Sequence, residues 1–199
     1  MPSIDRLARH GTIDWALPRH IREEYDAEGK FRTHKGRRWY PAQMYQRMSF
    51  EWVEENLCCP DCGGRLCLRP RARNGSRELG NVTCGGCGKT LTLVVSIVPA
   101  TGLVRMSSYL GLLRAIKEKS LPDFVLLTYD KDSLGVTCLL YLRGYAVTPE
   151  FVRPGWRSQE EKDAGRDIWC DIVIGALGQH AGEALVNLVA DGRPAGTGL

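Results

Sequence analysis

Near-continuous apolar runs recur from residue 91 onward in this 199-residue chain. Runs of this kind are typical of strands that are buried on both faces of a sheet. They predict strands at 91–98, 124–129, 136–142, 168–174 and 184–189. Between the first two runs, Tyr109, Leu112 and Ile116 recur at helical spacing and predict a helix over 107–118. The order strand, helix, strand and then further strands indicates an α/β fold with a mixed sheet.

A second helical pattern lies upstream of these strands, because Met44, Met48 and Trp52 can share one face of a helix over 42–56. We expect residues 1–41 to form an N-terminal extension, in which Pro18 limits any helix between 13 and 24. Residues 42–193 then form the main domain. Residues 194–199, rich in glycine, are expected to form a flexible tail.

Two C-x-x-C motifs lie between the helix and the first strand. Cys59 and Cys62 form one, Cys84 and Cys87 form the other, and 21 residues separate them. Two such turns can supply four thiolates to one tetrahedral Zn²⁺, which predicts a structural zinc ribbon over 57–90; two disulfides or four unrelated thiols are the alternatives. Cys58 could compete with Cys59 as a ligand, but Cys59 has the two-residue spacing to Cys62.

Composition restricts the setting of the protein. The chain has 27 basic and 23 acidic residues and a net charge of +4, so the whole molecule is only mildly basic. We find no cationic start followed by an apolar stretch, and no run of 18 apolar residues, so neither a secretory signal nor a membrane span is expected. Eight cysteines, four of them in metal-binding spacing, favour a reducing cytoplasm.

A cluster of arginines lies between the two cysteine motifs. Five arginines fall within 13 residues, namely Arg65, Arg69, Arg71, Arg73 and Arg77. Guanidinium groups match phosphate geometry, and their binding to nucleic acid releases counterions. The cluster therefore predicts a nucleic-acid-binding surface, and an exposed hairpin that only improves solubility is the alternative.

A second cationic segment lies before the first predicted helix. Here Lys35, Arg37 and Arg38 precede the aromatic pair Trp39 and Tyr40. Cations interleaved with aromatic rings suit contacts with phosphates and bases. The alternative is a solvated loop whose rings anchor it to the protein.

Several segments accompany the cysteine motifs in the order and spacing of one known family. They are the helix from Gln43 to Val53, Tyr109, 124–129, 147–149, 164–172 and 188–192. Together with the cysteine motifs, these segments extend over about residues 42–193. This part of the chain resembles the nuclease domain of the DpnI-like, methyl-directed (type IIM) restriction endonucleases. The resemblance implies a restriction-endonuclease-like PD-(D/E)xK core with an embedded zinc ribbon.

The resemblance also implies where catalytic groups would stand. In this family an aspartate precedes the second cysteine motif and a Glu-x-Lys follows it, so that two carboxylates hold Mg²⁺ and the lysine helps to activate water. The matching positions in this chain hold Asn81, Thr92 and Val94. Threonine and valine cannot replace a carboxylate and an ammonium group. We therefore expect these positions to be degenerate and the chain to use no Mg²⁺.

Three functions follow from these observations. The first is a catalytically inactive DpnI-like protein that binds nucleic acid, DNA rather than RNA, or acts as an accessory subunit with other proteins in a prokaryotic defence, restriction or mobile-element system. The second is an active Mg²⁺-dependent endonuclease with a relocated carboxylate, such as Glu78 or Glu118. The third is a zinc-stabilised adaptor between proteins. We expect no C-terminal winged-helix domain, because the sequence ends soon after the family pattern.

Overall fold

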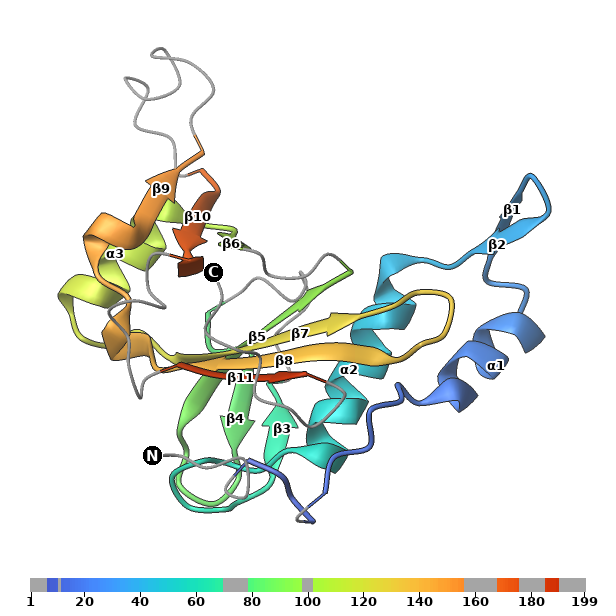
Figure 1. Ribbon diagram of the computed structural model, residues 1–199, viewed down its shortest axis with the longest axis horizontal. Coiled ribbons are helices and arrows are strands. Elements are labelled where there is room, and N and C mark those ends of the chain that lie inside the picture. Colours follow the sequence, from blue (N-terminus) through green and yellow to red (C-terminus); the bar gives the residue numbers. More distant parts are fainter. Residues whose placement is uncertain are drawn as a thin grey trace.

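A mixed six-stranded sheet forms the centre of the protein, in the strand order β11-β8-β7-β5-β4-β3 (Figure 1). The computed structural model describes residues 7–10, 12–69, 79–97, 102–155, 168–175 and 185–189. The strands of this sheet are β3 (Leu66–Leu68), β4 (Val82–Cys84), β5 (Thr90–Ser96), β7 (Asp123–Tyr129), β8 (Val136–Leu142) and β11 (Leu185–Val189). The mixed α/β sheet expected from the sequence is confirmed.

The parallel pair β5 and β7 lies at the middle of this sheet. The connection between them passes through β6 (Leu103–Met106) and α3 (Tyr109–Lys117), as parallel strands require a crossover. Ser108 caps α3, because its Oγ accepts a hydrogen bond of 2.9 Å from the amide of Gly111. Every residue of β7 is buried, which explains the apolar run from Phe124 to Leu127.

A smaller three-stranded sheet lies with α3 at one end of the molecule (Figure 1). It has the order β6-β10-β9, where β9 is Val152–Pro154 and β10 is Cys170–Val173. The 3₁₀ turns η2 (Gly144–Ala146) and η3 (Pro149–Phe151) lead from β8 to β9. The apolar run at 168–174 is therefore a strand, as expected, but it belongs to this second sheet.

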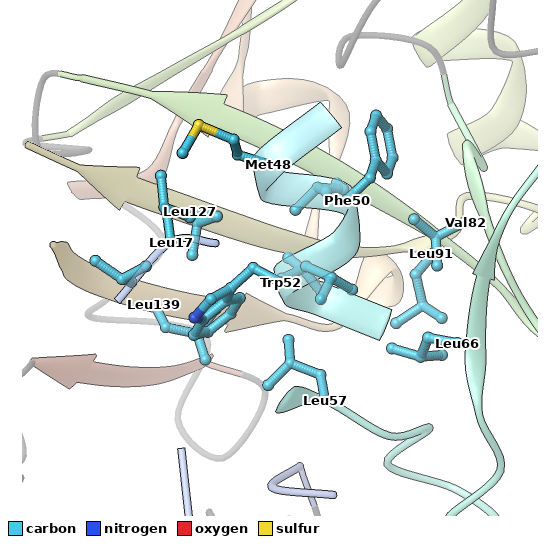
Figure 2. Packing of buried hydrophobic residues seen from close by; sticks show 14 of the residues in the cluster. Leu17, Met48, Phe50, Trp52, Leu57, Leu66, Val82, Leu91, Leu127 and Leu139 are labelled. Atoms are coloured by element: carbon cyan, nitrogen blue, oxygen red, sulfur yellow. The ribbon is translucent and has the colours of Figure 1, made fainter. Parts of the chain in front are cut away.

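Hydrophobic cores cover both faces of the large sheet. On one face, α2 (Ala42–Asn56) buries Met48 and Trp52 against residues of β5, β7 and β8 (Figure 2). On the other face, α3 and the small sheet pack over Val94 and Phe124. Alternate side chains of β5 therefore pack in different cores. This two-residue period is expected of a strand that lies between two layers.

The N-terminal region packs against the same core as α2. Leu7, Leu17 and Ile21 are at most 1% exposed, and the indole of Trp52 donates a hydrogen bond of 2.6 Å to the carbonyl of Asp14. Helix α1 (Arg19–Ala27) begins directly after Pro18. The strands β1 (Arg32–His34) and β2 (Arg37–Trp39) form a separate hairpin beyond α1 (Figure 1). In the described part of the chain, no helix combines the length and apolarity that membrane crossing requires.

Candidate metal site and nucleic-acid interface

The four cysteines of the two C-x-x-C motifs converge on one point. Their Sγ atoms all lie within 4.8 Å of one another, with 3.7 Å between Cys59 and Cys87 and 3.4 Å between Cys62 and Cys84. A disulfide requires about 2.0 Å, whereas four ligands at about 2.3 Å from a tetrahedral Zn²⁺ are separated by about 3.8 Å. The geometry is that of four free thiols that could hold a metal ion.

Each cysteine motif is closed by the same kind of turn. The amide of Gly63 donates to the carbonyl of Cys59 at 2.8 Å, and the amide of Gly88 donates to the carbonyl of Cys84 at 3.0 Å. Both glycines have left-handed backbones, with φ of +71° and +73°. Glycine adopts this conformation without strain, so it lets each motif fold back and present both of its sulfurs to the same side.

The space around the sulfurs excludes larger side chains. A Cβ atom on Gly64 would lie 2.8 Å from the Sγ of Cys84 and 3.1 Å from the Sγ of Cys62. A Cβ on Gly86 would lie 3.4 Å from the same Cys62 sulfur. Gly64 therefore keeps open the volume in which the sulfurs converge, while a Cβ at Gly86 would make an ordinary contact, and the residues present fit a tetrahedral metal ion.

The thiols differ in how readily they ionise. Burial raises the pKa of Cys59 to about 12. At Cys84 burial also acts to raise the pKa, but hydrogen bonds from the amides of Cys87 and Gly86 outweigh it, and the pKa is lowered to about 7. A bound cation would favour the thiolate at all four positions, because its charge stabilises the ionised form. Cys58 lies outside the cluster, and its Sγ is 3.5 Å from the carbonyl of Leu7.

The three positions that the resemblance assigns to catalysis have structural contacts instead. Asn81 is 2% exposed, its Nδ2 donates to the carbonyl of Leu93 at 3.0 Å, and its Oδ1 accepts from the amide of Leu93 at 2.7 Å. This pair of bonds requires both the donor and the acceptor of a side-chain amide. A carboxylate at position 81 would place an oxygen against the Leu93 carbonyl.

Thr92 and Val94 are also part of the packed interior. Thr92 is fully buried, and its Oγ1 accepts a hydrogen bond of 3.0 Å from the amide of Gly80. Val94 is 8% exposed and packs in the core beneath α3 and the small sheet. Neither side chain carries the carboxylate or the ammonium group that the resemblance implies at its position.

A cluster of four charged side chains joins the first cysteine motif to the large sheet. The Nζ of Lys89 lies 2.5 Å from Asp61 and 2.6 Å from Asp123, and Nη1 of Arg143 lies 2.8 Å and 2.9 Å from the same two carboxylates. Tyr141 also donates a hydrogen bond to Asp123. The sequence analysis missed this cluster, since its members are separated by up to 82 residues.

These two carboxylates do not offer an open metal site. The ammonium group of Lys89 occupies the position between them that a cation would need. Across the described segments, no other set of three or more histidine, cysteine or carboxylate side chains converges as the four cysteines do. Of the acids considered for a relocated site, Glu118 is an exposed residue at the end of α3, and Glu78 lies outside the described residues.

The arginines between the cysteine motifs are described only in part. Arg65 forms an ion pair of 3.2 Å with Glu54, and the guanidinium of Arg69 donates to the carbonyl of Gly80 at 3.2 Å. Arg71, Arg73 and Arg77 lie outside the described residues. Their part of the expected nucleic-acid surface therefore stays a prediction.

The second cationic segment forms the β1–β2 hairpin. Lys35 and Gly36 have φ of +49° and +74° and form the two-residue turn between the paired residues His34 and Arg37, which is typical of a tight antiparallel hairpin. Lys35 and Arg37 are exposed, and neither forms an ion pair among the described residues. Arg38, in contrast, is bound to Asp26 at 2.8 Å.

The hairpin also lines a cavity that the sequence analysis did not anticipate. The cavity has a volume of about 680 Å³ and lies between α1, the hairpin and the start of α2. Four aromatic residues, Tyr25, Phe31, Trp39 and Tyr40, are among those that line it. The available signal was the recurrence of aromatic residues among cations from residue 25 to residue 40.

Comparison with known proteins identifies the family. A search among curated proteins finds no match to this chain. A family model described as DpnI, Dam-replacing family, matches residues 36–195, which include both cysteine motifs, α2, α3 and the whole of the large sheet. The chain therefore belongs to the DpnI, Dam-replacing family.

Proposed function

We propose that this chain is a DNA-binding member of its family without nuclease activity, whose ribbon is folded by a structural Zn²⁺. The observation that carries the proposal is the environment of Asn81, Thr92 and Val94. At these positions the resemblance calls for two carboxylates and a lysine, but the side chains bond to the backbone or fill the core. Mg²⁺ has no ligands there, so the water that attacks the phosphodiester would not be activated.

Two features support binding to DNA. Family membership suggests a restriction-type nuclease fold, and such folds act on DNA. The β1–β2 hairpin presents Lys35 and Arg37 to solvent without acidic partners among the described residues, and free cations of this kind gain most from contact with phosphates. A prokaryotic defence, restriction or mobile-element system, with other protein subunits and a reducing cytoplasm, is the setting that we propose.

Lys35 allows this proposal to be tested without damage to the fold. Lys35→Asn removes one cation from the hairpin and places a residue that tolerates left-handed backbone in the turn. Lys119→Asn is the matched control, because Lys119 is also an exposed lysine with a left-handed backbone, φ +54°, but it lies after α3. Both variants change the net charge equally and should fold at least as well as the parent.

The measurement is the affinity for a labelled DNA duplex between 50 and 200 mM salt. We expect Lys35→Asn to bind several-fold more weakly and to reduce the slope of log affinity against log salt by about 0.9, the value for one phosphate contact. Lys119→Asn should have the same affinity and the same salt dependence as the parent protein. With Mg²⁺ present, no variant should cleave the duplex. Cleavage that stops when Mg²⁺ is chelated would establish a relocated nuclease site, and absence of any salt-dependent binding would favour the adaptor.

A further inference from the structure

The aromatic cavity beside the hairpin has a rigid part and an exposed part. The rigid part is formed by Phe31 and Tyr40. The hydroxyl of Tyr40 donates to Asp26 at 2.6 Å, and the guanidinium of Arg38, which is bound to the same Asp26, lies 4.6 Å from the centre of the Phe31 ring. Arg22 lies 4.8 Å from the centre of the Tyr40 ring. These contacts hold the two rings in place before any ligand binds.

Trp39 is the exposed part. Its side chain is 53% exposed, although exposure of a large aromatic ring to water is unfavourable. The Nζ of Lys131 lies 5.8 Å from the centre of the ring. A partly exposed indole on the wall of a cavity with two fixed rings is suited to stack against a flat ligand.

The surrounding charge indicates that the ligand is an anion. The sequence has no acidic residue between Glu28 and Glu51, and this segment holds six lysines and arginines. Arg32 lies directly opposite Trp39 in the hairpin, and Arg37 lies two residues before Trp39 on the same face. Neither arginine forms an ion pair among the described residues. Two free cations therefore flank one exposed aromatic ring.

We propose that this cavity binds one unstacked DNA base against Trp39, while Arg32 and Arg37 hold the adjoining phosphates. The proposal rests on the DNA binding proposed above and specifies one subsite of it. Within a duplex, base faces are covered by their neighbours and only base edges are accessible. A cavity lined by rings can contact base faces, so it selects a single-stranded or extruded nucleotide.

The test compares two single-stranded DNA 12-mers of equal charge, one of thymidines and one that is abasic throughout. Stacking on an aromatic side chain contributes about 1–3 kcal/mol per base, so the parent protein should bind the thymidine strand about 5- to 150-fold more tightly. Trp39→Ala should reduce this ratio to nearly 1, and Trp39→Phe should retain most of it. Tyr145→Ala is the matched control, because Tyr145 is 77% exposed and lies in η2, away from the cavity.

Each outcome separates the two proposals. If Trp39→Ala has the same ratio as the parent, or if the parent does not distinguish the strands, the base-binding site is refuted while salt-dependent DNA binding stands. If the parent binds neither these strands nor duplex DNA, both proposals fail. Loss of the ratio in Tyr145→Ala as well would show that the effect is not specific to the cavity, and would also refute the site.

Discussion

At the residue scale, Asn81 shows how one of the three positions that the resemblance assigns to catalysis is used for backbone contacts instead. Its amide bonds to both the amide and the carbonyl of Leu93, and it is 2% exposed. Aspartate has the same shape but no donor at neutral pH. The side chain that the resemblance implies for a nuclease is therefore incompatible with the backbone contacts that position 81 now makes.

Asn81→Asp should therefore destabilise the protein without creating a metal site. The buried carboxylate would lose one hydrogen bond and face a carbonyl oxygen, which should lower the free energy of unfolding by about 2–4 kcal/mol. Urea denaturation measures this loss. Gln43→Glu adds the same charge at an exposed position of α2 and should change stability by less than about 0.5 kcal/mol. Stabilisation of Asn81→Asp by millimolar Mg²⁺ would contradict our interpretation.

At the scale of elements, the charged cluster fastens the first cysteine motif to the start of β7. Asp123 is 6% exposed and binds Lys89 and Arg143. Burial alone would raise the pKa of Asp123, but Lys89, Tyr141 and the amide of Gly144 outweigh burial and lower it. A carboxyl group whose pKa is lowered by folding stabilises the folded state above its ordinary pKa, near 4, and that stabilisation is lost as the pH falls through the folded value.

Asp123→Asn should thus cost stability in a pH-dependent way. The substitution leaves Lys89 and Arg143 with Asp61 as their one remaining carboxylate among the described residues, and we expect a decrease of about 3 kcal/mol in the free energy of unfolding between pH 5 and pH 8. The difference in the free energy of unfolding between Asp123→Asn and the parent protein should become smaller below about pH 4. Asp171→Asn, which removes a pair with the half-exposed Arg105, should cost less than about 1 kcal/mol. A pH-independent difference would show that Asp123 acts through packing alone.

The elements also show what the sequence could predict. Helix α2 was expected from helical spacing, since it buries one face, and the strands β5, β7 and β8 were expected from apolar runs, since each is buried along most of its length. Strand β6 was missed because only two of its four residues are buried. The hairpin was missed because all six residues of its strands are exposed, so no apolar alternation marks them.

The parts of the site that depend on tertiary contacts could not be predicted in the same way. The cysteine cluster was predicted because two local turns define it. The charged cluster has no local signature, because Asp61, Lys89, Asp123 and Arg143 come from four separate segments. The cavity depends on the packing of α1 against α2, which no sequence period encodes.

At the scale of the whole molecule, the cysteine ribbon and the sheet share one core. Cys59 and Cys84 are at most 1% exposed and pack in the same cluster as Trp52 and Leu93. Strands β3 and β4 of the ribbon also continue the large sheet beside β5. The ribbon is therefore not an independent appendage, and a change at the four cysteines should be transmitted to the hydrophobic core.

Removal of the proposed Zn²⁺ should accordingly lower the melting temperature, and the whole protein should still unfold in a single transition. Metal binding to the folded state alone stabilises that state by mass action, and each 1 kcal/mol lost lowers the melting temperature of a chain of this size by about 2–4 °C. We expect treatment with a zinc chelator to lower the melting temperature by about 10 °C or more, with coincident loss of the far-UV and tryptophan signals.

The substitution Gly64→Ala should lower the melting temperature similarly without chelator, because its Cβ would lie 2.8 Å from the Cys84 sulfur. Gly85→Ala is the control, because its closest contact would be at 3.7 Å, and it should bind metal normally. Two separate transitions after chelation would instead show that the ribbon and the sheet fold independently.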